Sequence, residues 1–163
     1  MADFNAHLTQ AKRNCEILKS MNAFVSDSWD WQLTNAFYVA VHVVNGHMAI
    51  IDNQHYKSHE AIKNALFSID KVKVPEDVYL AYVKLEQLSR RARYLCSEKK
   101  GEDSSMSYLT YEVHFAKAIR HLDVVLTYFC KRHKIDFPKC TLNCIELKGD
   151  TLTYFTHQSQ AAA

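Results

Sequence analysis

The chain has 163 residues, 48% of them hydrophobic and 23% charged, and its formal net charge is +2 at neutral pH. This length suits one soluble domain, and a net charge so near zero gives no general argument for nucleic-acid binding. The polar start of the chain lacks a signal-peptide core, and no apolar run is long enough to span a bilayer, so we expect a cytoplasmic protein without membrane contact.

The scarcity of turn-forming residues favours an all-α fold. Only three glycines and two prolines occur, which indicates long helices rather than a many-stranded sheet. Apolar residues at helical spacing predict a bundle of about five helices, over residues 4–20, 29–51, 58–67, 73–94 and 108–133. Ser26, Asp27 and Ser28 offer a cap for the second helix, and Ser58 offers one for the third. We expect loops at 52–57 and 99–105.

The second predicted helix is apolar on most of its faces, as expected for the central helix of a bundle. Gly46 interrupts it, although glycine costs about 1 kcal/mol relative to alanine in a helix. We interpret Gly46 first as a point of close helix packing and second as a place where a ligand approaches.

The composition changes after Pro138. Residues 144–147 and 151–155 are rich in β-branched and aromatic side chains, and they flank a turn at Gly149. The pattern predicts a short C-terminal β-hairpin, which must pack on the bundle or on a partner because an isolated hairpin is marginal in water. We therefore divide the chain into a bundle at 1–137 and an extension at 138–160.

Cysteines and histidines give little support for a metal site. Five cysteines, an odd number, are scattered along a chain without an export signal, which favours reduced thiols. The spacing of Cys130, His133, Cys140 and Cys144 is irregular for zinc, and His42 and His47 are five apart rather than four. We predict no metal and no cofactor. The three glycines also lie too far apart for a phosphate-binding loop.

The most informative segment is the end of the fourth predicted helix, where arginines gather over one turn. The candidate phosphate- or RNA-binding residues are Ser89, Arg90, Arg91, Arg93 and Tyr94. A structural alternative stays open, in which these side chains pair with carboxylates such as Asp30 or Asp52 and complement the helix dipole. The lysines and arginines at 117–134 form a second basic group that could extend the surface.

Three features together resemble the HEPN superfamily of prokaryotic helical bundles. They are the aromatic-rich helix at 29–51, the segment SHEAIKN at 58–64 and the segment LSRRARY at 88–94. The resemblance covers roughly residues 8–130 and is similar to the small stand-alone members. It implies a homodimer that works in toxin–antitoxin or antiphage systems, possible contact with RNA or a nucleotide, and a protein partner from the same system.

Many HEPN proteins are metal-independent ribonucleases with an Arg-x4-6-His motif, and this chain lacks that motif. We therefore expect a binding or regulatory module rather than an enzyme. An atypical ribonuclease remains an alternative, with His59, Arg91 and Arg93 as catalytic candidates and His47, His55 and Asn64 in support. His42 is a further histidine that could face the arginines. A third possibility is a structural bundle without a ligand.

Overall fold

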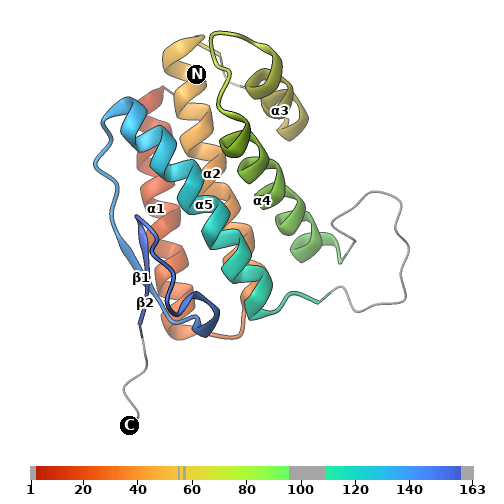
Figure 1. The fold of residues 1–163 in the computed structure, drawn as a ribbon, viewed down its shortest axis with the longest axis vertical. Coiled ribbons are helices and arrows are strands. Elements are labelled where there is room, and N and C mark those ends of the chain that lie inside the picture. Colours follow the sequence, from red (N-terminus) through yellow and green to blue (C-terminus); the bar gives the residue numbers. More distant parts are fainter. Residues whose placement is uncertain (1–2, 55, 57, 96–108, 159–163) are drawn as a thin grey trace.

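The computed structural model describes residues 3–54, 56, 58–95 and 109–158, and this part of the chain folds into a helical bundle with a small C-terminal sheet (Figure 1). The helices are α1 (Phe4–Phe24), α2 (Trp29–Ile51), α3 (His59–Ser68), α4 (Glu76–Tyr94) and α5 (Glu112–His133). The strands are β1 (Cys140–Leu142) and β2 (Phe155–His157), with a 3-10 turn, η1 (Ile145–Leu147), between them. The predicted all-α class is confirmed. The predicted loop at 99–105 lies outside the described residues.

Helix α2 is the centre of the bundle, as its apolar composition predicted. It packs against α1, α4 and α5, and Figure 1 shows it behind α5 and between α1 and α4. The short helix α3 packs against α4 at one end of the molecule. None of the helices in the described part of the chain is long and apolar enough to cross a membrane.

Local polar contacts fix where the helices begin. The Asp3 carboxylate accepts a hydrogen bond from the Ala6 amide at 2.8 Å, and the Ser58 hydroxyl accepts one from the Ala61 amide at 3.1 Å. Such contacts satisfy amides of the first turn that have no partner within the helix. Ser28 occupies the cap position of α2 as expected, but its hydroxyl donates to the Val25 carbonyl at 2.7 Å instead of capping the helix.

The C-terminal strands are parallel, so the predicted hairpin is wrong. Residue Cys140 pairs with Phe155, and the expected first strand forms the turn η1 instead. The residues after Gly149 do not pair across a turn because the Asp123 carboxylate of α5 accepts the Thr153 amide at 3.0 Å and the Tyr154 amide at 2.7 Å. These hydrogen bonds to the bundle therefore take the place of the pairing between strands that a hairpin requires.

The C-terminal segment is attached to the bundle through both its core and its backbone. The strand β1 packs on α1 and the turn η1 packs on α5. The Asn22 side chain of α1 accepts the Asn143 amide at 2.6 Å and donates to the Asn143 carbonyl at 3.2 Å. Apolar residues of the segment complete the core that the helices begin: Cys140, Leu142, Cys144, Leu147 and Phe155.

Candidate functional site

The arginine-rich end of α4 does not form one patch. Ser89 is fully buried, and its hydroxyl has no hydrogen-bond partner among the residues that the structure describes. The Arg91 guanidinium donates to the Leu109 carbonyl at 3.1 Å, whereas the Arg93 Nε donates to the Ser89 carbonyl at 3.2 Å. Positions 89 and 93 share a helix face and position 91 lies on the other side, because each residue turns the helix by about 100°. The predicted cluster is thus divided between two faces.

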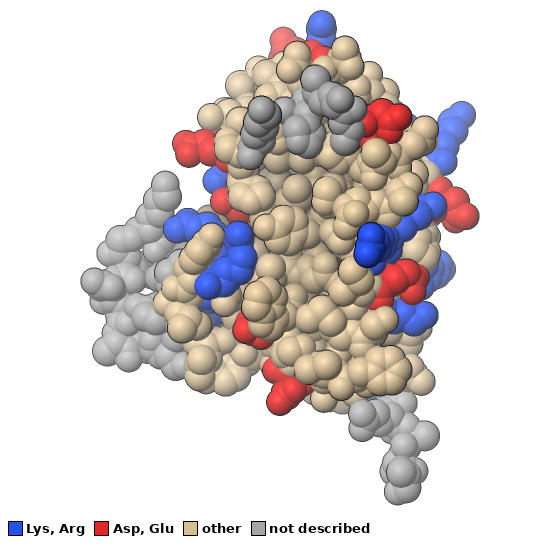
Figure 2. Space-filling view, turned by 180° about the vertical axis from the view of Figure 1, so that it is seen from behind, with Lys and Arg blue, Asp and Glu red and all other residues tan. Residues whose placement is uncertain are grey.

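Arg93 lies over aromatic rings, and in the described part of the chain it forms no ion pair with a carboxylate. Its guanidinium carbon is 5.1 Å from the centre of the Tyr94 ring and 6.0 Å from the centre of the Phe37 ring. An aromatic face attracts a cation but leaves its charge uncompensated. Arg93 therefore keeps a full positive charge for a ligand, while Tyr94 is exposed beside it. Figure 2 shows the charged side chains of the face opposite to that of Figure 1 in separate small groups, without a continuous basic surface.

A pocket with three histidines lies between α1, α2 and the start of α3. Its volume is about 550 Å³, and we call it the histidine pocket; it is lined by His7, Tyr38, Val41, His42, Asn45, Tyr56, Ser58, His59 and Ile62. Imidazoles accept or donate protons near neutral pH, so their gathering in one hollow is suited to acid–base chemistry or to holding a polar ligand. Among the described residues, no group of three or more histidine, cysteine or acidic side chains is arranged to hold a metal ion.

The first two histidines of the pocket touch each other across the α1–α2 interface. The Nδ1 atoms of His7 and His42 are 3.1 Å apart, and their ring centres are 5.4 Å apart. A hydrogen bond between these two atoms requires one to donate and the other to accept, so both Nδ1 atoms cannot carry a proton at once. The pair therefore links α1 to α2 through one imidazole that donates and one that accepts.

Gly46 brings these two helices together. A Cβ atom at this position would lie 3.3 Å from Phe4 Cδ2 and 3.5 Å from His7 Cβ. The glycine therefore permits the close approach of α1 that places His7 against His42. The sequence-based interpretation of Gly46 as a close-packing position is confirmed.

Asn45 presents an unusual polar group at the wall of the histidine pocket. Its Nδ2 donates to the Val41 carbonyl at 3.1 Å, while its Oδ1 is buried without a partner in the described part of the chain. A buried acceptor without a hydrogen bond costs about 1–3 kcal/mol. Such groups are rare in folded proteins and often mark a place where a water or a ligand binds.

His59 lines the histidine pocket and also contacts the Phe37 ring beneath Arg93. Its ring lies 5.0 Å from the ring of Phe37, the same ring over which Arg93 is placed. Burial lowers the pKa of His59, the Glu86 carboxylate opposes this effect, and the positive charges of Arg93 and Lys63 lower the pKa further. The neutral form of His59, which can accept a proton, is therefore favoured, and its Nδ1 is buried without a partner among the described residues.

Two buried residues of α4 with polar groups, Glu86 and Tyr82, lie near His59 and Phe37. Glu86 forms an ion pair with Lys63 of α3, with 2.7 Å between Nζ and Oε2. The Tyr82 hydroxyl is buried without a partner, and its ring lies 5.8 Å from that of Phe37. Burial raises the pKa of Tyr82, and the Glu86 carboxylate raises it further, so the phenol stays protonated.

The structure separates the supporting residues that the sequence suggested. His47 is fully buried, with its Nδ1 2.9 Å from His133 Nε2 and its Nε2 3.2 Å from the Val72 carbonyl, so it belongs to the core. Asn64 is exposed on α3. His55 lies outside the described residues. His7 was missed, because only the crossing of α1 and α2 brings it to the other histidines.

The cysteines suggested as an alternative zinc site take separate neighbours. Cys140 contacts the thiol of Cys15, Cys130 contacts the Tyr154 hydroxyl, and Cys144 contacts the Glu112 carboxylate. All four of the cysteines Cys15, Cys130, Cys140 and Cys144 are buried and carry free thiols. They are therefore part of the core, at the contact between the helices and the C-terminal segment.

The fold and the site define an all-α bundle with a histidine-lined pocket beside one aromatic-stacked arginine. Comparison with protein-family models, with curated proteins and with solved structures found no match for this chain. The HEPN resemblance therefore stays a prediction from the sequence.

Proposed function

We propose that this protein is a HEPN-like binding module that forms a homodimer and acts as an accessory or antitoxin-like subunit of a prokaryotic defence or toxin–antitoxin system. The ligand in this proposal is the phosphate of RNA or of a nucleotide. The observation that carries it is the contact of both Arg93 and His59 with the Phe37 ring, since His59 also lines the histidine pocket. A guanidinium offers a permanent charge and fixed donors, and imidazoles offer further donors and acceptors.

Binding of RNA and of nucleotides at low salt, in the presence of a chelator, tests the proposal. We expect Arg93→Ala to weaken binding about tenfold, because it removes a charge-assisted contact to phosphate. Arg13→Ala is the matched control, since Arg13 is an exposed arginine of α1 outside the pocket. Equal loss in both variants would indicate nonspecific attraction to basic side chains, and absence of binding in all three proteins would leave a bundle without a ligand.

The homodimer is supported by aromatic side chains on the outer side of α2. Trp31 is 63% exposed and Tyr38 is 38% exposed, whereas Phe37 on the inner side is fully buried. Exposed aromatic residues are enriched at interfaces between proteins. Light scattering coupled to gel filtration measures the mass, and we expect Trp31→Glu to convert a dimer into a monomer. A monomeric wild type at tens of micromolar would contradict this part of the proposal.

A second candidate function is metal-independent cleavage of RNA, and the position of His59 favours it. A neutral His59 would remove the proton from a ribose 2′-hydroxyl as that oxygen attacks the adjacent phosphorus. The bond from phosphorus to the 5′-oxygen would break, that oxygen would leave as a hydroxyl after taking a proton from water, and a 2′,3′-cyclic phosphate would remain. Arg93 would stabilise the charge that develops on the phosphate. End-labelled tRNA and mixed cellular RNA in chelator test for cleavage. Loss of cleavage in His59→Ala and Arg93→Ala, but not in Arg13→Ala, would establish it; equal cleavage by every variant would reveal a contaminant.

A further inference from the structure

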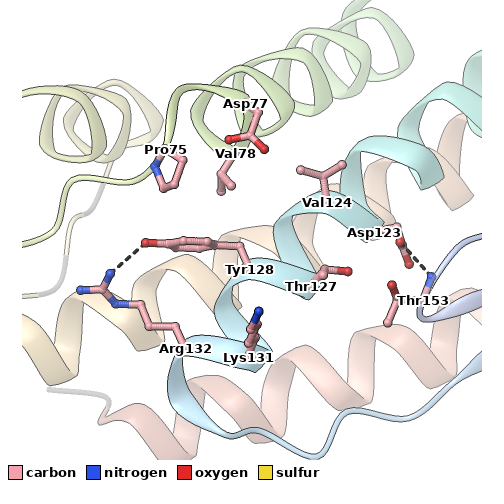
Figure 3. Close-up of a pocket in the computed structure, with 10 residues that line it drawn as sticks. All are labelled: Pro75, Asp77, Val78, Asp123, Val124, Thr127, Tyr128, Lys131, Arg132 and Thr153. Atoms are coloured by element: carbon pink, nitrogen blue, oxygen red, sulfur yellow. Dashed lines mark hydrogen bonds between the residues drawn. The ribbon is translucent and has the colours of Figure 1, made fainter.

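A second and larger hollow runs along α5, away from the histidine pocket. It lies between the start of α4 and helix α5, and Thr153 of the C-terminal segment closes one end (Figure 3). Its volume is about 850 Å³, which is within the range of small-molecule sites. Its floor runs from Asp123 to Arg132 along α5, a length of roughly 13 Å at 1.5 Å per residue. We call it the α4–α5 groove.

One end of the α4–α5 groove is positively charged. Lys131 and Arg132 line it, and in the described part of the chain neither forms an ion pair with a carboxylate. The Arg132 Nη1 donates to the Tyr128 hydroxyl at 2.8 Å, a neutral acceptor that holds the guanidinium in place without cancelling its charge. Figure 3 shows Lys131 between Arg132 and Thr127, with Val78 of α4 and Pro75, the residue before α4, on the opposite side. This end can bind an anionic group.

Two carboxylates line the rest of the α4–α5 groove. Asp77 is exposed in the first turn of α4, above Val78 in Figure 3, and Asp123 lies on α5 at the end that Thr153 closes. The Asp123 oxygens already accept two backbone amides, so Asp77 is the acceptor that remains for a ligand. A nucleic-acid strand entering at Lys131 would carry its next phosphates toward these carboxylates and be repelled. The charge pattern therefore fits a compact ligand with a single anionic end.

The middle of the α4–α5 groove supplies apolar walls, because Val78 and Val124 line it. Thr127 also lines the groove, but its Oγ1 is buried and has no hydrogen-bond partner among the described residues. The apolar walls therefore contact the body of a ligand there.

We propose that the α4–α5 groove binds a phosphorylated sugar, of the sugar-phosphate or mononucleotide class. Lys131 and Arg132 hold the phosphate, and Asp77 accepts hydrogen bonds from the sugar hydroxyls. This site is separate from the histidine pocket, and it does not depend on the function proposed for that pocket.

Isothermal titration of the full-length protein tests this site with four probes at low salt: adenosine 5′-monophosphate, ribose 5-phosphate, adenosine and inorganic phosphate. We expect the two phosphorylated sugars to bind, and adenosine and inorganic phosphate each to bind about tenfold more weakly, since each lacks one end of the ligand. Ribose 5-phosphate that binds as tightly as the nucleotide assigns the sugar-phosphate class, and tighter binding of the nucleotide assigns the mononucleotide class.

Substitutions of residues that line the groove test whether the ligand binds there. Lys131→Ala and Arg132→Ala are expected to weaken nucleotide binding about tenfold each, whereas Lys117→Ala, an exposed lysine of the same helix outside the groove, is expected to leave it unchanged. Binding that survives Lys131→Ala but is lost in Arg93→Ala would place the nucleotide in the histidine pocket and overturn the inference. Inorganic phosphate bound as tightly as the nucleotide, or no binding of any probe at millimolar concentration, would also overturn it.

These measurements test the proposal for the α4–α5 groove and the proposed function of the histidine pocket separately. Nucleotide binding that depends on Lys131, together with no RNA binding that depends on Arg93, would refute the proposed function and leave the groove standing. The reverse result would refute the groove alone.

Discussion

The buried imidazole of His47 makes the stability of this protein sensitive to acid. His47 is fully buried against Phe129 and His133, and burial lowers its pKa to about 4 from an ordinary value of 6.5. The unfolded chain therefore binds a proton on His47 between pH 6.5 and pH 4, whereas the folded chain does not. The contribution of the neutral His47 to the free energy of unfolding is therefore fully present above pH 6.5 and decreases as the pH falls toward 4.

The shift of the His47 pKa sets the size of this loss at about 3 kcal/mol, since each pH unit corresponds to about 1.4 kcal/mol. That is a large fraction of the 5–15 kcal/mol by which a domain is usually stable. The pKa values of His59 and His133 are also lowered, mainly by burial, so their contributions have the same sign. Acid is therefore expected to unfold the protein well before its exposed carboxylates are all protonated.

Urea denaturation between pH 7 and pH 4, under reducing conditions, measures the effect. In His47→Gln the amide can still reach the Val72 carbonyl but does not titrate, so we expect wild type to lose about 3 kcal/mol more than this variant over the range. Phe129→Leu is the control: it removes packing against the same ring, and it should lower stability at every pH while keeping the wild-type slope. Parallel curves for wild type and His47→Gln would refute the reasoning.

Three further variants test the packing that builds the sites. Asn22→Ala removes both hydrogen bonds to the Asn143 backbone and should cost about 2–3 kcal/mol in urea denaturation; a loss below 0.5 kcal/mol would show that water replaces them. Asp123→Ala leaves two amides of the C-terminal segment without a partner and should cost about 2 kcal/mol, with faster hydrogen exchange in that segment as the specific readout. Gly46→Leu should push α1 away and cost about 1–3 kcal/mol by overpacking, and unchanged stability would contradict the close contact.

Sequence periodicity was sufficient to place the five helices, because each has a buried stripe, but not all of their ends: α1 continues to Phe24 instead of ending at residue 20, and α4 begins at Glu76 instead of residue 73. The cap at Ser58 and the apolar character of α2 were both visible before the structure. The pairing of the C-terminal strands was not, because it depends on Asp123, which is distant in sequence and takes the amides that a hairpin would have used. Strand pairing is a long-range property, and a local pattern of β-branched residues does not encode it.

Only part of the candidate site could be predicted from the sequence. The division of the arginine cluster follows from helix geometry, since Ser89 and Arg93 share a face that Arg91 does not, and this signal was available. The contact of His7 with His42 was not available, because it requires knowledge of how α1 crosses α2 at Gly46.

The inner face of α4 gives the strongest physical argument for where function resides. Tyr82, Glu86, Ser89 and Arg93 recur at the spacing that brings apolar residues into a core, yet all four are polar. The hydroxyls of Tyr82 and Ser89 are buried without partners, which costs stability that apolar residues at the same positions would not lose. Local rules of folding are most often broken at functional sites. Because this stripe ends at the ring that Arg93 shares with His59, it favours the edge of the histidine pocket, rather than the exposed arginines, as the place to look for a ligand.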